Sequence, residues 1–181
     1  MKPEVGPDIK KYRAITYLES GRQKFSIGNY IEALELFNKS IEADETFLRA
    51  YTAKATCLIY LDRIQEAEEV CDEVIKKDAQ FGLAYTTKGV IMHKTGRLEE
   101  ADKVYKIGIM LEPDEPTTWY NYACFCALAG KEDLCRENLE EAIKLNRFYN
   151  SIAATDSDFL VYRDRDWFKE LIAFRRENSD G

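Results

Sequence analysis

Residues 96–113 read GRLEEADKVYKIGIMLEP, and this stretch decides the fold. A glycine opens it, an alanine follows five residues later, and an aromatic residue, a second glycine and a proline come after. When the stretch is compared with the rest of the chain, its pattern returns at an offset of 34 residues. It occurs four times, in windows 14–47, 48–81, 82–115 and 116–149, which indicates an internal repeat.

The repeat is visible in columns that keep the character of their residues. One column is aromatic in all four windows, although only 12% of the residues in the chain are aromatic, and reads Tyr17, Tyr51, Tyr85, Trp119. Two columns are small, and they read Gly21, Ala55, Gly89, Ala123 and Ala33, Ala67, Ala101, Cys135. A further column is mostly large and reads Phe37, Cys71, Tyr105, Leu139. We expect the small columns to let two helices approach closely and the large side chains to fill the space beside them.

Each window is predicted to hold two helices. In the second window, apolar residues recur at the three- and four-residue spacing of a helix. The breaks between paired helices fall at Gly28, Asp62, Gly96 and Gly130, and glycine is typical of a left-handed C-terminal cap. The outer turns fall at Asp44, Asp78, Glu112-Pro113 and Asn146, whose side chains can accept backbone hydrogen bonds.

This period and these columns resemble the tetratricopeptide repeat. The resemblance covers residues 14–149 and implies an all-α fold, a right-handed α-α superhelix of four helix-turn-helix repeats. Residues 1–13 are then an N-terminal extension, in which Asp8 is a candidate helix cap, and residues 150–181 form C-terminal capping helices. The capping segment is similar to the aromatic tail of many prokaryotic members, with a short helix expected from Ser157 and a final helix from Asp166.

Composition excludes several classes of function. The formal net charge of −7 argues against nucleic acid as the main partner, because phosphate binding needs a basic face. The start of the chain has no apolar signal region and no run of 18 apolar residues occurs, so we expect neither secretion nor a membrane span. Five cysteines without a framework spacing are typical of reduced thiols, which favours a cytoplasmic protein.

The sequence offers little for catalysis, so we expect no enzyme, no cofactor and no metal. His93 is the one histidine of the chain, and no nucleophile stands beside it in the sequence. Cys124 and Cys126 are two residues apart on a predicted helix and point about 200° apart, so they cannot bind one ion together. The chain contains neither of the two glycine-rich patterns that bind phosphate groups, G-x-G-x-x-G and G-x-x-x-x-G-K-[ST].

The resemblance places a peptide-binding groove on the first helices of the repeats. The residues expected to line it are Leu18, Arg22, Phe25, Arg49, Thr52, Thr56, Ile59, Thr86, Val90, His93, Tyr120 and Cys124. The best-known groove of the family binds acidic chaperone tails through Lys and Asn on the first inner helix and Lys and Arg on the third. The matching positions here hold Leu18 with Arg22 and Thr86 with Val90, so no acidic chaperone tail is expected.

The leading hypothesis is a protein–protein interaction adaptor whose groove takes an apolar or mixed segment of a partner, with anchors near Tyr120 and Val90. The protein would act as a monomer or a weak homo-oligomer. The alternative is a self-assembling structural scaffold that docks through Trp167 and Phe168. RNA binding through terminal basic residues is a third interpretation, and its residues are Lys10, Lys11, Arg13, Arg175 and Arg176.

Overall fold

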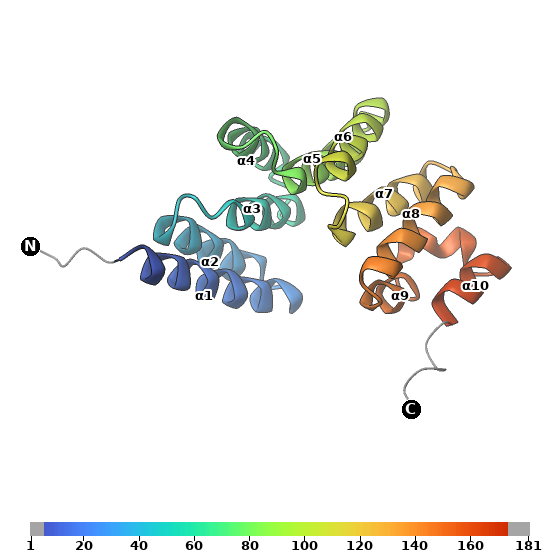
Figure 1. The fold of residues 1–181 in the computed structure, drawn as a ribbon, viewed down its shortest axis with the longest axis horizontal. Helices are drawn as coiled ribbons and strands as arrows, with labels where there is room; N and C mark the ends of the chain where they lie inside the picture. The colour runs from blue at the N-terminus through green and yellow to red at the C-terminus, as the bar shows by residue number, and fades with distance from the viewer. Residues whose placement is uncertain (1–5, 174–181) are drawn as a thin grey trace, which may run out of the picture.

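The computed structural model describes residues 6–173, and within them the chain is helical and contains no strand. The helices follow one another along an arch, with α1 at one end and α9 and α10 at the other (Figure 1). Their bounds are α1 Pro7–Ser26, α2 Tyr30–Ala43, α3 Leu48–Tyr60, α4 Ile64–Lys77, α5 Gly82–Lys94, α6 Leu98–Leu111, α7 Pro116–Leu128, α8 Glu132–Leu145, α9 Phe148–Ala153, the 3₁₀ helix η1 Ser157–Tyr162 and α10 Asp166–Ala173. The predicted all-α superhelix of helix pairs is confirmed.

The two helices of each pair are joined by a residue in the left-handed region. Gly28, Gly96 and Gly130 have φ angles of +78°, +78° and +70°, which confirms the predicted glycine caps. Asp62 takes the same role in the second repeat with φ +59°, although it has a Cβ atom. The residue after each of these four donates its backbone N–H to a carbonyl of the last turn of the preceding helix, as in the 2.8 Å bond from Arg97 to the carbonyl of Met92.

The outer turns, which join one pair to the next, follow the sequence prediction at three of four places. The Oδ1 atoms of Asp44, Asp78 and Asn146 each accept a backbone N–H two residues further on, at 3.0, 2.9 and 3.0 Å. Glu112 is the exception, because its Oε2 atom is buried without a hydrogen-bond partner among the described residues. Glu115 caps that turn instead, since its Oε1 atom accepts the backbone N–H of Thr117.

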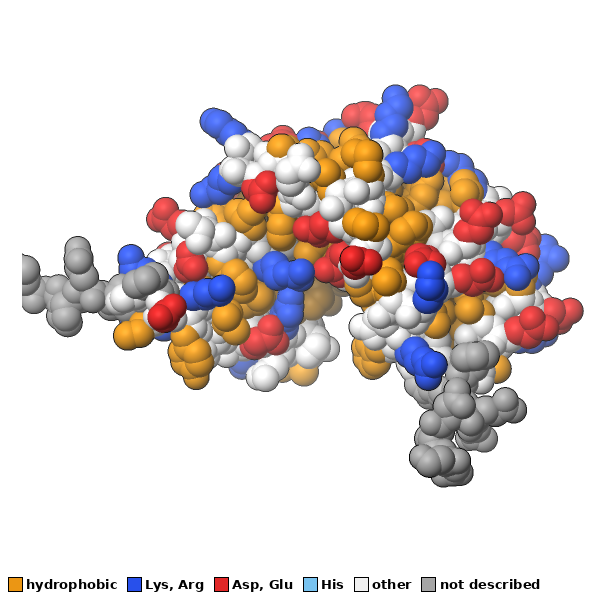
Figure 2. Space-filling view, viewed as in Figure 1, with side chains coloured by type: hydrophobic (Ala, Val, Ile, Leu, Met, Phe, Trp, Pro, Cys, Tyr) orange, Lys and Arg blue, Asp and Glu red, His pale blue; other side chains and the backbone are white. Residues whose placement is uncertain are grey.

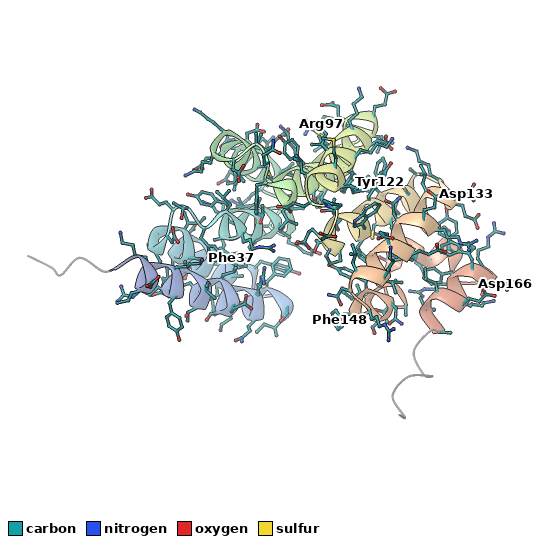
Figure 3. All side chains as sticks on the ribbon, in the orientation of Figure 1. Phe37, Arg97, Tyr122, Asp133, Phe148 and Asp166 are labelled. Atoms are coloured by element: carbon teal, nitrogen blue, oxygen red, sulfur yellow. The ribbon has the colours of Figure 1, made fainter. Side chains whose placement is uncertain are left out.

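Packing within a pair depends on the glycine columns. A Cβ atom at Gly21 would lie 2.5 Å from the ring of Phe37, and one at Gly89 would lie 2.8 Å from the ring of Tyr105. Both rings are buried, and Phe37 lies between α1 and α2 (Figure 3). The glycines of the first helices therefore make room directly for the large side chains of the second helices.

At the N-terminus, the prediction for the cap was wrong. Helix α1 begins at Pro7, with Gly6 at the cap position, and Asp8 lies in the first turn. An acidic residue in the first turn interacts favourably with the positive end of the helix dipole. The early start of α1, seven residues before the first repeat window, agrees with the expected extension.

The C-terminal segment folds back onto the last repeat. Its two expected helices are present, the first as the 3₁₀ helix η1 and the second as α10, but α9 was missed. Phe159 and Phe168 are fully buried and pack in one cluster with Cys135 and Leu139 of α8. Because Phe168 is inaccessible, it cannot contribute to the docking surface that the self-assembly alternative placed at Trp167 and Phe168.

Candidate peptide-binding concavity

The inner helices of the repeats converge on one concavity. It has a volume of about 560 Å³, and its walls come from α1, α3, α5, α7 and α9 with one residue of α2. Figure 2 shows the molecule hollowed between the α1–α2 end and the α9–α10 end. Residues of α1 and α9, more than 100 positions apart in the sequence, line the same space.

Nine of the twelve predicted groove residues line this concavity. They are Arg22, Phe25, Arg49, Thr52, Thr56, Ile59, Thr86, Val90 and Tyr120. These nine belong to α1, α3, α5 and α7, which places them in successive repeats as the 34-residue period implies.

Three of the predicted groove residues lie elsewhere. Leu18 is 2% exposed and packs in a core cluster with Ala33 and Phe37, so it faces the second helix of its own repeat. His93 is half-buried and meets the ring of Phe125 edge-on, with 5.3 Å between ring centroids. Cys124 is 9% exposed and faces the C-terminal segment.

Burial affects the protonation of His93. It lowers the pKa of the imidazole, and the negative charge of Asp158 acts in the opposite direction. The lowered pKa favours a neutral ring near neutral pH. This ring packs against an aromatic neighbour and carries no positive charge to the concavity.

Tyr120 lines the concavity, but the C-terminal segment covers most of its side chain. Its ring is 7% exposed and lies 4.7 Å from that of Tyr149 and 5.8 Å from that of Phe159, measured between centroids. Its hydroxyl donates a 2.6 Å hydrogen bond to Oδ2 of Asp156. Burial is the main cause that raises the pKa of this hydroxyl, and its hydrogen bond to Asp156 also raises the pKa. The hydroxyl therefore remains protonated. Tyr120 therefore forms part of the wall, and only a small part of its side chain is exposed to an incoming segment.

The sequence prediction missed two other parts of the lining. Tyr60 lines the concavity at the end of α3, is 58% exposed, and packs with Phe25 and Tyr30 at centroid distances of 4.9 and 5.1 Å. Tyr149 and Ile152 line it from α9. Tyr60 follows the predicted Ile59 directly, whereas α9 could be found only by extending the repeat into the tail.

The charged side chains of the lining are Arg22 and Arg49, although the whole chain is acidic. Arg22 contacts Glu19 at 3.0 Å and Arg49 contacts Glu115 at 3.4 Å. Both arginine side chains are about half exposed, so water screens these pairs and they contribute little to stability. Each guanidinium has five N–H donors, and most of them remain available to an incoming group.

Hydroxyl groups line the floor of the concavity. Those of Thr52, Thr56 and Thr87 donate to carbonyls of their own helices, at 2.9 to 3.1 Å. Their oxygen atoms can still act as acceptors, because a hydroxyl that donates once keeps two lone pairs. With the apolar rings and the arginines, the concavity can contact a segment of mixed chemistry.

A solenoid of helix pairs with a mixed apolar concave face is the kind of structure that repeat proteins use for binding. Two models of the tetratricopeptide repeat match residues 25–91 and 116–149, which together are more than half of the chain. The chain therefore belongs to the tetratricopeptide repeat family. Proteins of this family generally mediate protein–protein interactions.

Solved structures with the same fold are similar over most of the chain. A thermophilic tetratricopeptide repeat protein of Thermus thermophilus is 20% identical, with a TM-score of 0.71 and 88% of each chain covered. The pilF protein of Pseudomonas aeruginosa is 21% identical, with a TM-score of 0.64, and the match covers 91% of this chain and 77% of that one.

The first repeat domain of Spaghetti (RPAP3), bound to the HSP90 peptide SRMEEVD, is 26% identical with a TM-score of 0.54. That match covers 62% of this chain and 90% of the Spaghetti chain. No curated protein sequence matches the chain. In the part of the chain that the structure describes, no helix is both long and apolar enough to span a bilayer.

Proposed function

We propose that the concavity binds a short segment of a partner protein and that the chain acts as an adaptor. The observation that carries the proposal is the convergence of five inner helices on one open, largely apolar space of about 560 Å³. Pockets of about 300–1,000 Å³ that are mostly apolar with a few polar groups are typical binding sites. Phe25, Tyr60 and Val90 offer the apolar contacts, and Arg22 and Arg49 offer hydrogen-bond donors.

An acidic chaperone tail is not the expected partner. The Spaghetti domain binds an HSP90 peptide, but the residues here at the corresponding clamp positions are Leu18, Arg22, Thr86 and Val90. Leu18 and Thr86 are both buried, and the Val90 side chain has no hydrogen-bonding group. A peptide ending in MEEVD should therefore bind no more tightly than an unrelated peptide, and a micromolar complex would contradict this.

Site-specific photocrosslinking tests the proposal. A benzophenone amino acid in place of Tyr60, which lines the concavity, should form an adduct with one defined partner segment in cells that make the protein. The same amino acid in place of Met110, which is 71% exposed on α6 and does not line the concavity, is the matched control. Adducts of equal yield at both positions would contradict a binding site in the concavity.

A cytoplasmic location and a monomer or weak homo-oligomer are parts of the same proposal. All five cysteines are free and buried, which supports a reducing compartment. The self-assembling scaffold is not favoured, because Phe168 is buried and Trp167 donates a 2.9 Å hydrogen bond to Glu132 of α8. The RNA-binding interpretation depends on five terminal basic residues. Three of them are exposed on α1, namely Lys10, Lys11 and Arg13, and the other two, Arg175 and Arg176, lie outside the described residues.

A further inference from the structure

A thiol and two carboxylates meet behind the wall of the concavity. Cys124 comes from α7, and Asp156 and Asp158 come from the turn that starts η1. One donor atom from each of the three residues lies within 4.8 Å of the other two, and the distance from Cys124 Sγ to Asp156 Oδ2 is 4.0 Å. The fold brings together residues that are more than 30 positions apart in the sequence.

Two carboxylates lie close together in this group, and the Cys124 thiol donates a 4.0 Å hydrogen bond to Oδ2 of Asp156. Cys124 is nine-tenths buried, and both carboxylates are half-buried. Among residues 6–173, no lysine or arginine forms an ion pair with Asp156 or Asp158. A cation placed between the three groups would offset the repulsion between the two carboxylates.

We propose that Cys124, Asp156 and Asp158 bind a divalent transition-metal ion of the zinc type. A sulfur and an oxygen ligand of tetrahedral zinc are about 3.6 Å apart, so the observed 4.0 Å requires only a small adjustment. A thiolate ligand favours zinc over magnesium or calcium, which prefer oxygen ligands alone. On binding, the Cys124 thiol releases its proton to solvent and the thiolate sulfur binds the ion.

The neighbours of Asp156 already hold its carboxylate in place. Oδ2 accepts the Tyr120 hydroxyl at 2.6 Å, and Oδ1 accepts the backbone N–H of Asp158 at 3.0 Å. Each oxygen has a second lone pair, and hydrogen bonds of this kind orient the carboxylate ligands of metal sites. A bound ion would join η1 to α7 and would fix the wall of the concavity at Tyr120.

Titration with Co²⁺ tests the site, because a thiolate ligand gives a near-ultraviolet charge-transfer band that carboxylates do not give. The reduced, metal-free full-length protein should develop this band and reach saturation at one equivalent, and Zn²⁺ should abolish it. Cys124→Ala should remove the band, and Asp158→Asn should weaken Co²⁺ binding at least tenfold. Cys126→Ala, on the same helix and fully buried, is the matched control and should titrate like the wild type.

Several results would overturn the proposal. They are the absence of the band in the wild-type protein, its survival in Cys124→Ala, its loss in Cys126→Ala, or unchanged affinity in Asp158→Asn. The Asp158 variant keeps the cap of η1, which Asp156 provides, so its test does not depend on how Cys124→Ala folds. Zn²⁺ should also raise the melting temperature of the wild type and not that of Asp158→Asn at the same concentration.

Discussion

The hydroxyl of Tyr120 donates a 2.6 Å hydrogen bond to Asp156, and this bond joins the inner face of the fourth repeat to the C-terminal segment. The same carboxylate caps η1 by accepting the backbone N–H of Asp158. One side chain thus starts the capping helix and holds a ring that lines the concavity. The stability of the cap and the shape of the concavity are therefore coupled.

Tyr120→Phe should destabilise the protein by about 1–3 kcal/mol, because it removes a hydrogen bond to a partly buried carboxylate. Urea unfolding followed by circular dichroism measures the effect. Tyr85→Phe is the matched control, because the Tyr85 hydroxyl donates to the carbonyl of Ala79 at an exposed position. This substitution should change the free energy of unfolding by less than about 0.5 kcal/mol. Equal effects of the two substitutions would contradict the coupling.

Gly89→Ala should destabilise the contact between α5 and α6, the two helices of the third repeat. A Cβ atom there would meet the buried ring of Tyr105 at 2.8 Å, and overpacking of this kind costs about 1–3 kcal/mol. The gain in helix propensity, up to about 1 kcal/mol, offsets only part of this cost. In a Tyr105→Leu background the added methyl group has more room. Gly89→Ala should therefore lower the free energy of unfolding less in that background than in the wild type. Higher stability of Gly89→Ala than of the wild type would show that the ring moves freely.

Asp62→Gly should stabilise the protein by about 0.5–1 kcal/mol, because Asp62 is held at φ +59° where glycine is strained least. The loss of its exposed contact with Lys94, at 3.8 Å, should be negligible. Gly96→Asp at the equivalent turn of the third repeat is the reciprocal test and should destabilise by a similar amount. Melting temperatures that change in the same direction for both variants would contradict this explanation.

Asp102 should make stability depend on pH in the acid range. Burial raises the pKa of its carboxyl, but hydrogen bonds from Lys106, Lys131 and Tyr122 outweigh burial and bring the pKa to about 2, below the ordinary 3.8. Figure 3 shows Tyr122 on α7, facing α6. Because the folded pKa is the lower one, the stabilisation is present above about pH 4 and is lost as the pH falls toward 2.

The difference in unfolding free energy between wild type and Asp102→Asn measures this contribution. It should be largest near neutral pH and should shrink steadily as the pH falls from 5 to 2. A difference that stays constant over that range would show that Asp102 contributes hydrogen bonds but no titrating charge.

The repeat period made much of the fold predictable from sequence. Local chemistry determines the glycine turns at Gly28, Gly96 and Gly130 and the side-chain caps at Asp44 and Asp78, so each could be predicted from its own few residues. The same period also predicted most of the lining, because residues 34 positions apart occupy equivalent places on successive inner helices. At Glu112 the prediction failed because this longer side chain is half-buried, and its buried Oε2 atom does not make the short turn bond of aspartate.

The remaining part of the site depends on contacts between distant parts of the arch. The 34-residue period of the sequence does not predict these contacts. Nothing in the residues around Tyr120 or Cys124 indicates that the tail will fold back and cover them. In the same way, α9 begins at the very end of the fourth repeat window and lies mostly beyond it, yet Tyr149 and Ile152 line the concavity together with residues of α1. Phe148 of the same helix is 67% exposed, so the six residues of α9 give no clear apolar face to predict from (Figure 3).

The most direct test of the central claim is the affinity of the crosslinked partner segment, made as a synthetic peptide, for the protein and for Thr56→Arg. Thr56 lies on α3 at the floor of the concavity, and a long side chain there would fill the space without removing a core contact. Lys103→Arg, exposed on α6, is the control. Binding at the concavity predicts at least tenfold weaker affinity for Thr56→Arg and no change for Lys103→Arg. Equal affinity of all three proteins would contradict it and would place the binding surface elsewhere on the molecule.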